Sequence, residues 1–238
     1  MRELIIIAVA AMVVLSSCSK DDSNELEPTP PENSGSPTTG YAEADHWDVM
    51  WVQLWEGGPK FAEYNVGAEW QGWHGRKAGR EGNYYTWGGY DNVVGNTNPS
   101  YNTSSVALDG NSDTATKLWG DNWRMPTEKE FQALLDNCDV EIVKRRSPSI
   151  LFDVYGANGW KFTGRGEYSS NSIFLPAAGF CYKGVIRDAG NICYYWSSTN
   201  CCSFPIVLIL PCYDQDNRPL INTNYSNYGF SVRPVLKE

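Results

Sequence analysis

Cysteine is the residue type whose number in this 238-residue chain first calls for a chemical explanation. Beyond Cys18 there are six, which are Cys138, Cys181, Cys193, Cys201, Cys202 and Cys212. Their spacing contains no C-x-x-C pair, so it does not predict a zinc site. An even number in an exported protein permits disulfides. Cys181 and Cys193 could close a hairpin, but free buried thiols fit equally well. The sequence therefore leaves the pairing open.

Sets of catalytic side chains are sparse. The two histidines, His46 and His74, fall at the edge of a linker and in an expected loop, so neither is placed to activate a nucleophile. Asp214 and Asp216 match the first and third positions of a calcium loop, but the following positions carry residues that cannot coordinate the ion. The chain has no phosphate-binding or dinucleotide-binding glycine motif. A pair of hydrolytic carboxylates has no sequence spacing of its own and stays open. We expect a non-enzymatic protein without cofactor or metal.

The N-terminus has the pattern of an export signal. Arg2 precedes an unbroken apolar run from Leu4 to Leu15, which is too short to span a bilayer comfortably. The sequence L-S-S-C, which ends at Cys18, resembles a bacterial lipobox. We therefore expect residues 1–17 to be a lipoprotein signal peptide and Cys18 to carry the lipid anchor in the membrane.

Residues 18–40 are expected to be a lipidated, disordered linker, because their four prolines and many small polar residues cannot bury a core. The start of this segment, Ser19 to Asp22, resembles the signal that sends lipoproteins of Bacteroidota to the outer face of the outer membrane. The expected location is therefore the outer membrane, with the domain exposed at the cell surface.

Residues 41–238 are expected to form one domain, since about 200 residues can carry a single core. Ten Trp, fourteen Tyr and abundant glycine favour many short strands joined by turns. The formal charge of −9 argues against a nucleic-acid partner, because phosphate binding needs a basic surface.

The elements follow from local patterns. A hairpin is expected over Val49 to Gly67, with Gly57-Gly58-Pro59 at its turn, and a short aromatic strand at residues 84–87. One helix should run from Thr114 to Trp119, capped by Asp113, and a second should begin at Thr127, whose spacing to Glu130 is that of a capping box. Further strands are expected at residues 160–163, 172–176, 180–185, 192–197, 204–210 and 230–235. Helices followed by antiparallel strands indicate an α+β class.

Four ordered motifs resemble one family. They are W-G-x-x-W-R-M-P-T-x-x-E at residues 119–130, N-S-I-F-L-P-A-A-G at 171–179, Y-W-S-S-T at 195–199 and G-F-S-V-R-P-V at 229–235, and N-V-G-A at 65–68 adds to them. This pattern is similar to the Fibrobacter succinogenes major paralogous domain (FISUMP) family, which is common in surface lipoproteins of Bacteroidota. The resemblance covers about residues 49 to 235.

The resemblance implies a C-type-lectin-like fold, shared with formylglycine-generating enzymes and with the receptor-binding proteins of diversity-generating retroelements. Neither the copper-binding cysteine pair of those enzymes nor the sugar-binding triplet of calcium-dependent lectins has a match here. We expect Trp119, Trp123 and Trp196 to anchor the core. Arg124 and Arg233 stand in apolar strings and so require buried partners, with Glu130 or Asp121 as candidates.

The segment from Thr199 to Tyr228 departs most from the family pattern. In the apolar run from Phe204 to Leu210, Val207 and Ile209 should point away from the inward-facing residues, which predicts an apolar outer face. That face is either covered by residues 67–111 or free to bind a ligand. The candidate ligand-binding residues are Cys201, Cys202, Phe204, Val207, Ile209, Asp214, Asp216, Asn217, Arg218, Asn222, Asn224 and Tyr225. If this patch is diversified, a near-duplicate of its coding segment should lie beside a reverse transcriptase gene.

The function favoured by these patterns is a surface-anchored, non-catalytic ligand-binding or adhesion module. Its partner would be a host or bacterial surface protein or a glycan. Loop aromatics such as Trp70, Trp73 and Tyr90 suit a glycan, whereas the apolar run suits a protein. The alternatives are an enzyme of the formylglycine-generating type, a glycan hydrolase, and a structural component of a surface fibre.

Overall fold

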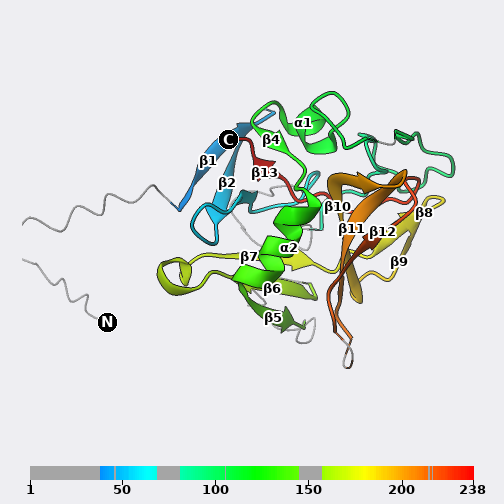
Figure 1. Cartoon of the computed structure of the whole chain (residues 1–238). Coiled ribbons are helices and arrows are strands. Elements are labelled where there is room, and N and C mark those ends of the chain that lie inside the picture. Colours follow the sequence, from blue (N-terminus) through cyan, green and yellow to red (C-terminus); the bar gives the residue numbers. More distant parts are fainter. Residues whose placement is uncertain are drawn as a thin grey trace, which may run out of the picture. The chain divides into compact units, whose positions relative to one another are not determined.

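Figure 1 shows the computed structural model of the chain, which describes residues 38–45, 47–68, 81–104, 106–144, 157–213, 215 and 217–238. Residues 37–238 form one compact unit. Within the described ranges, no helix has the length and apolar character needed to cross a membrane. Several sequence predictions fall outside the described residues, namely those on the signal peptide, Cys18, nearly all of the linker, His46, Trp70, Trp73, His74, Asp214 and Asp216.

A five-stranded antiparallel sheet joins the two ends of the domain (Figure 1). Its order is β1 (Thr39–Ala44), β2 (Trp47–Gln53), β3 (Lys60–Ala62), β13 (Val235–Leu236) and β4 (Trp123–Arg124). The β2–β3 pairing confirms the predicted hairpin, with Gly57 in the left-handed region at its turn. The first strand begins at Thr39, inside the segment expected to be linker.

Both predicted helices are present. Helix α1 (Thr114–Trp119) begins after Asp113, whose side chain accepts a hydrogen bond from the Thr116 amide. Helix α2 (Glu128–Asn137) begins after Thr127, and the capping box with Glu130 is complete in both directions. Local side-chain chemistry therefore sets where each helix starts.

The remaining strands form three small antiparallel sheets. They are β5 (Asp139–Val143), β6 (Gly159–Thr163) and β7 (Ser172–Pro176); β8 (Phe180–Tyr182) and β9 (Val185–Arg187); and β10 (Ile192–Cys201), β11 (Phe204–Pro211) and β12 (Leu220–Thr223). A single turn of 3-10 helix spans Gly166–Tyr168. The domain is thus strand-rich and loop-rich, with two α-helices among the described residues, and belongs to the α+β class.

Three strand predictions were wrong in detail. The strand expected over residues 180–185 is the β8–β9 hairpin, because Lys183 and Gly184 both take positive φ and turn the chain. The strand expected over residues 230–235 is reduced to isolated bridges at Phe230 and Ser231 before the short β13, and residues 84–87 contribute one bridge, at Tyr85.

Strand β11 is buried on both faces, which corrects the prediction of an apolar outer face. Leu208 and Leu210 join the core cluster beneath α2. On the other face Val207 is fully buried in a second cluster that contains Tyr85 and Trp87, and Ile209 packs against the same cluster. Tyr85, Trp87 and Leu108 thus share this cluster with Val207, which supports the alternative that residues 67–111 cover the face. Trp119, Trp123 and Trp196 are buried in this second cluster, as predicted.

Candidate ligand-binding surface

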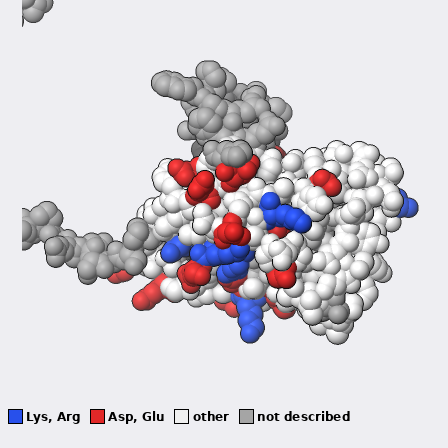
Figure 2. All heavy atoms as spheres, turned by 90° about the horizontal axis from the view of Figure 1, so that it is seen from above, with Lys and Arg blue, Asp and Glu red and all other residues white. Residues whose placement is uncertain are grey.

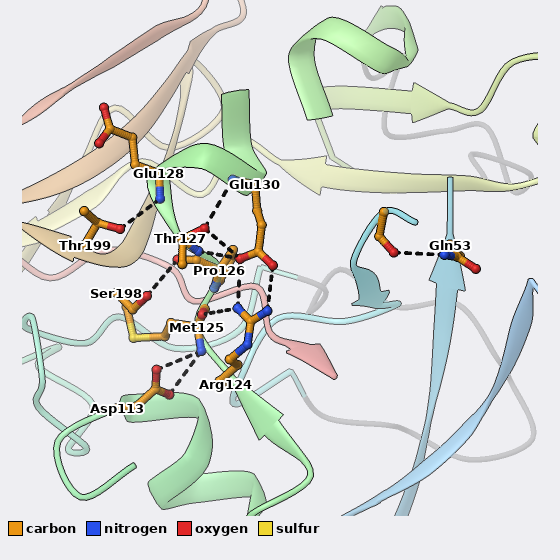
Figure 3. A network of polar contacts seen from close by, with 11 residues as sticks. Gln53, Asp113, Arg124, Met125, Pro126, Thr127, Glu128, Glu130, Ser198 and Thr199 are labelled. Atoms are coloured by element: carbon orange, nitrogen blue, oxygen red, sulfur yellow. Dashed lines mark hydrogen bonds and ion pairs between the residues drawn. The ribbon is translucent and has the colours of Figure 1, made fainter. Parts of the chain in front are cut away.

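The polar residues of the W-R-M-P-T-x-x-E motif bond to one another and hold α2 against β4 (Figure 3). The Arg124 guanidinium donates two hydrogen bonds to the Glu130 carboxylate, at 2.8 and 2.6 Å, as predicted. The same carboxylate accepts the Thr127 amide at 2.7 Å. Burial alone would raise the pKa of Glu130, but the hydrogen bonds from Arg124 and Thr127 lower it overall. This network is satisfied internally, so its role is structural.

Asp113 extends the network to α1. Its carboxylate accepts the Met125 amide at 2.9 Å (Figure 3), and it also accepts the Thr116 amide. Burial raises the pKa of Asp113 despite these hydrogen bonds. One carboxylate thus ties the start of α1 to the segment that leads into α2.

Arg233 is fully buried and acts as a cross-link within the core. Its guanidinium donates to Oδ1 of Asn65 and to the carbonyl oxygens of Ala62, Glu63 and Phe174, at 2.6 to 2.8 Å. Asn65 also donates to the hydroxyl of Tyr195 at 3.1 Å. The G-F-S-V-R-P-V and N-V-G-A motifs therefore meet in the interior and are not available to a ligand.

The predicted ligand-binding residues are split between the two ends of the β10–β11–β12 sheet. At one end, Cys201, Cys202 and Phe204 are exposed at the tip of the β10–β11 hairpin, where Cys201 pairs with Phe204 across the turn. Asn224 joins this end, because its amide donates to the carbonyl oxygen of Pro205 at 2.9 Å. Tyr225 follows it.

Asn217 and Arg218 lie in the connection between β11 and β12, which is at the other end of these strands. Asn222 lies between the two groups, on β12, where it pairs with Val207. Two members do not fit a ligand surface: Val207 is 0% exposed, and Ile209 packs into the same core cluster. The structure therefore brings together Cys201, Cys202, Phe204, Asn224 and Tyr225.

Four aromatic rings continue from this end across the surface, and we call them the aromatic ridge: Phe204, Tyr225, Tyr228 and Tyr182. The ring centroids of Phe204 and Tyr225 are 5.8 Å apart, those of Tyr225 and Tyr228 are 6.2 Å apart, and those of Tyr228 and Tyr182 are 4.7 Å apart. The last two pairs are near-parallel, with interplanar angles of 21° and 19°. Tyr225 is 62% exposed and Phe204 44%, while Tyr182 and Tyr228 are half-buried.

The ridge is fixed from below by further aromatic contacts. The ring centroid of Phe180 lies 5.6 Å from that of Tyr228 and 6.3 Å from that of Phe230. The centroid of Phe230 lies 4.3 Å from that of the buried Trp196. A continuous series of rings thus runs from the core to the surface. Because the half-buried rings are held by packing, little side-chain entropy remains to be lost when a ligand binds.

Polar groups stand beside the ridge. Oδ1 of Asn224 accepts the Tyr225 amide and Oδ1 of Asn222 accepts the Thr223 amide, both at 2.8 Å. Asn222 is exposed and Asn224 is partly exposed, and neither Nδ2 group has a hydrogen bond to an atom of the described residues. Lys183 places Nζ 5.4 Å from the Tyr182 ring centroid. On the face that Figure 2 shows, charged side chains are few over the end of the domain that carries β8 to β12 in Figure 1.

Tyr182, Tyr228 and Lys183 were missed by the sequence predictions. Their signal was present in the aromatic residues Phe180, Tyr182, Tyr225, Tyr228 and Phe230. Phe180 and Tyr182 were assigned to one strand and Phe230 to another, while Tyr225 and Tyr228 fell outside the predicted strands. Tyr90, which was considered for glycan stacking, is exposed in the loop that precedes α1, with Lys117 over its ring at 4.6 Å.

No group of three or more His, Cys, Asp or Glu side chains suited to a metal occurs in the part of the chain that the structure describes. No protein-family model, no curated protein and no solved structure matches this chain.

Proposed function

We propose that this chain is a lipid-anchored module of the bacterial cell surface that binds a glycan through the aromatic ridge and catalyses no reaction. The observation that carries this proposal is the row of four contacting rings, two of them strongly exposed, at the end of the β10–β11–β12 sheet. Exposed rings fixed by a rigid scaffold are groups that a binding surface needs, and loops on such a scaffold commonly carry recognition.

The chemistry of the ridge suits sugar rings. The apolar faces of a pyranose can pack on tyrosine and phenylalanine rings, because aromatic side chains offer large, stiff contact areas at low entropic cost. The amide donors of Asn222 and Asn224 and the tyrosine hydroxyl groups can hydrogen-bond sugar hydroxyl groups beside the stacked rings. On the face that Figure 2 shows, charged side chains are scarce over this end of the domain, which favours a neutral glycan over a highly charged one.

A protein partner loses its main support. The apolar run from Phe204 to Leu210 favoured a protein, but its central residues are buried within the domain and offer no docking face. What remains exposed is a narrow row of rings with polar neighbours. That composition differs from the broad apolar centre expected of a stable protein interface.

The proposed fold and location are consistent with this role. A C-type-lectin-like arrangement is supported by the pairing of the C-terminal strand β13 with β3 and β4, which joins the two ends of the domain in one sheet. A lipid on Cys18, followed by a polar linker, would hold that domain outside the outer membrane.

An array of host and bacterial glycans and cell-surface proteins, probed with the full chain in detergent, tests the proposal. We expect binding to one class of glycan, clearly weakened in Tyr225→Ala and kept in Tyr41→Ala. Tyr41 is a matched control because it lies on β1 and is 71% exposed. Binding to proteins alone, or equal glycan binding by both variants, would show that the aromatic ridge is not a glycan-binding site.

A further inference from the structure

Cys193 and Cys212 form a close pair of buried thiols that glycan binding does not use. Their Sγ atoms are 4.0 Å apart, and the side chains are 0% and 4% exposed. Cys193 lies near the start of β10, and Cys212 directly follows the end of β11. The pair therefore lies at the open end of the β10–β11 hairpin, opposite its turn.

The strand register holds the two sulfurs on the same side of the sheet. Cys193 pairs with Leu210, and Ile192 pairs with Pro211. The amide of Cys212 donates to the carbonyl oxygen of Asn191 at 2.7 Å, which continues the ladder by one step. Cys193 and Cys212 are therefore diagonal neighbours on one face, and the 4.0 Å between their sulfurs shows that the two side chains point toward each other.

The electrostatic surroundings of the two sulfurs differ. The hydrogen bond from Cys193 lowers the pKa of the Cys212 thiol against the opposing effect of burial, and the Trp160 side chain and Lys144 lower it further. Burial raises the pKa of Cys193 well above its ordinary value, and the contact with Cys212 adds to this. Cys212 is thus the better nucleophile of the pair.

We propose that Cys193 and Cys212 are a disulfide-forming pair that is oxidised as the chain folds outside the cytoplasm. The oxidant is itself a disulfide, of a small thiol or of a protein. The Cys212 thiolate attacks one of its sulfurs, forms a mixed disulfide and expels a thiolate. Cys193 then loses its proton to that thiolate and attacks Sγ of Cys212, which expels the second thiolate; this takes up from solvent the proton that Cys212 released. Two protein thiols are oxidised and one oxidant disulfide is reduced to two thiols.

Closing this bond requires the sulfurs to approach from 4.0 Å to about 2.05 Å. Rotation of the two side chains supplies part of that approach, and because diagonal positions are farther apart than directly opposed ones, a shift of the two strand ends supplies the rest. The product would join residues 19 positions apart and restrict the unfolded chain, which raises stability. Because both sulfurs are buried in the folded domain, the bond would then resist reduction.

Cys201 and Cys202 provide an internal contrast. Their Sγ atoms are 3.5 Å apart, but both residues are exposed and adjacent in sequence, where a disulfide would close a strained ring in the turn. We expect these two thiols to stay accessible to alkylating reagents while the buried pair does not.

The test uses the full chain, reduced and unfolded, then refolded in a mixture of oxidised and reduced glutathione. The protein is acid-quenched, alkylated under denaturing conditions, digested and mapped by mass spectrometry. We expect one reductant-sensitive link between the peptides of Cys193 and Cys212. This link should persist in the matched control variant C201S/C202S. We also expect a higher midpoint of guanidinium unfolding for the oxidised wild type than for the reduced one.

Full alkylation of Cys193 and Cys212 in the refolded protein, or a link from either residue to another cysteine, would overturn the proposal. The wild-type peptide map decides the question even if C193S fails to fold. Glycan binding is measured separately, so either result leaves the proposed function to be judged on its own test.

Discussion

Arg124 and Glu130 show that the partner of a charged residue can be predicted when the two residues are close in the sequence. The two side chains are six positions apart, and the capping box already fixes the direction in which the Glu130 carboxylate points. Their pairing could therefore be anticipated. The partners of Arg233 could not be anticipated, because Asn65 is 168 residues away in the sequence. Its other partners are main-chain carbonyl oxygens, which every residue has and which the sequence therefore does not distinguish.

Glu130→Gln separates the charge of this residue from its capping role, since glutamine can also complete a capping box. We expect the variant to lose about 1–2 kcal/mol of stability at pH 7, because a partly buried charged hydrogen bond is replaced by a neutral one. The folded-state pKa of Glu130 is lowered, so its contribution is present above the unfolded value of about 4.3 and is lost as pH falls through the folded value.

Urea unfolding of both proteins between pH 7 and pH 3 checks this expectation. The difference in unfolding free energy should shrink below about pH 5 as the wild type takes up the proton. A difference that stays constant down to pH 3 would show that the Glu130 charge contributes nothing.

Val207→Ser tests the correction made at β11. Val207 is fully buried, so a hydroxyl group and a smaller volume at this position should cost about 2–3 kcal/mol of stability. Glycan affinity should be unchanged at temperatures where the variant is folded. Val185→Ser on β9 is the control: Val185 is 56% exposed, and the same change should shift stability by at most about 0.5 kcal/mol. Equally small losses of stability in both variants would indicate that Val207 is exposed on an outer face of β11.

At the scale of elements, turns decided which predictions held. Gly57-Gly58-Pro59 marked the β2–β3 hairpin clearly, whereas Lys183-Gly184 is a weaker turn signal and the β8–β9 hairpin was read as one strand. The β10–β11 turn is more unusual still, because Cys202 and Ser203 both have positive φ, at 53° and 71°. L-residues with side chains rarely adopt this region.

Replacing that turn with Asn-Gly should relieve its cost. We expect C202N/S203G to gain about 1 kcal/mol of stability, because both new residues tolerate the left-handed region. The variant C202A/S203A removes the same two side chains without this tolerance and should gain nothing. Thermal unfolding of the two variants beside the wild type provides the comparison. Equal melting temperatures for the two variants would contradict this reading of the turn.

At the scale of the whole molecule, the sequence predicted the α+β class and the buried tryptophans but not the location of the exposed surface. An alternating pattern shows that β11 has two faces, but it cannot show that Tyr85 and Trp87, more than a hundred residues earlier, cover one of them. Phe204 and Tyr225 of the ridge were predicted, but Tyr182 and Tyr228 escaped prediction for the same reason. The ridge forms only when the β8–β9 hairpin, the tip of β11 and residues 225–228 meet in space.

The most direct test of the ridge measures, by calorimetry, the affinity of the tightest-binding glycan from the array. The wild type is compared with variants in which only Tyr225 is changed. We expect Tyr225→Ala to weaken binding about tenfold, as for other exposed aromatic anchors of binding sites. Tyr225→Phe keeps the aromatic ring, so its affinity should stay within about threefold of the wild-type affinity. The affinity of Tyr41→Ala should equal that of the wild type. Wild-type affinity in Tyr225→Ala, or equal losses in Tyr225→Ala and Tyr41→Ala, would contradict a glycan site on the aromatic ridge.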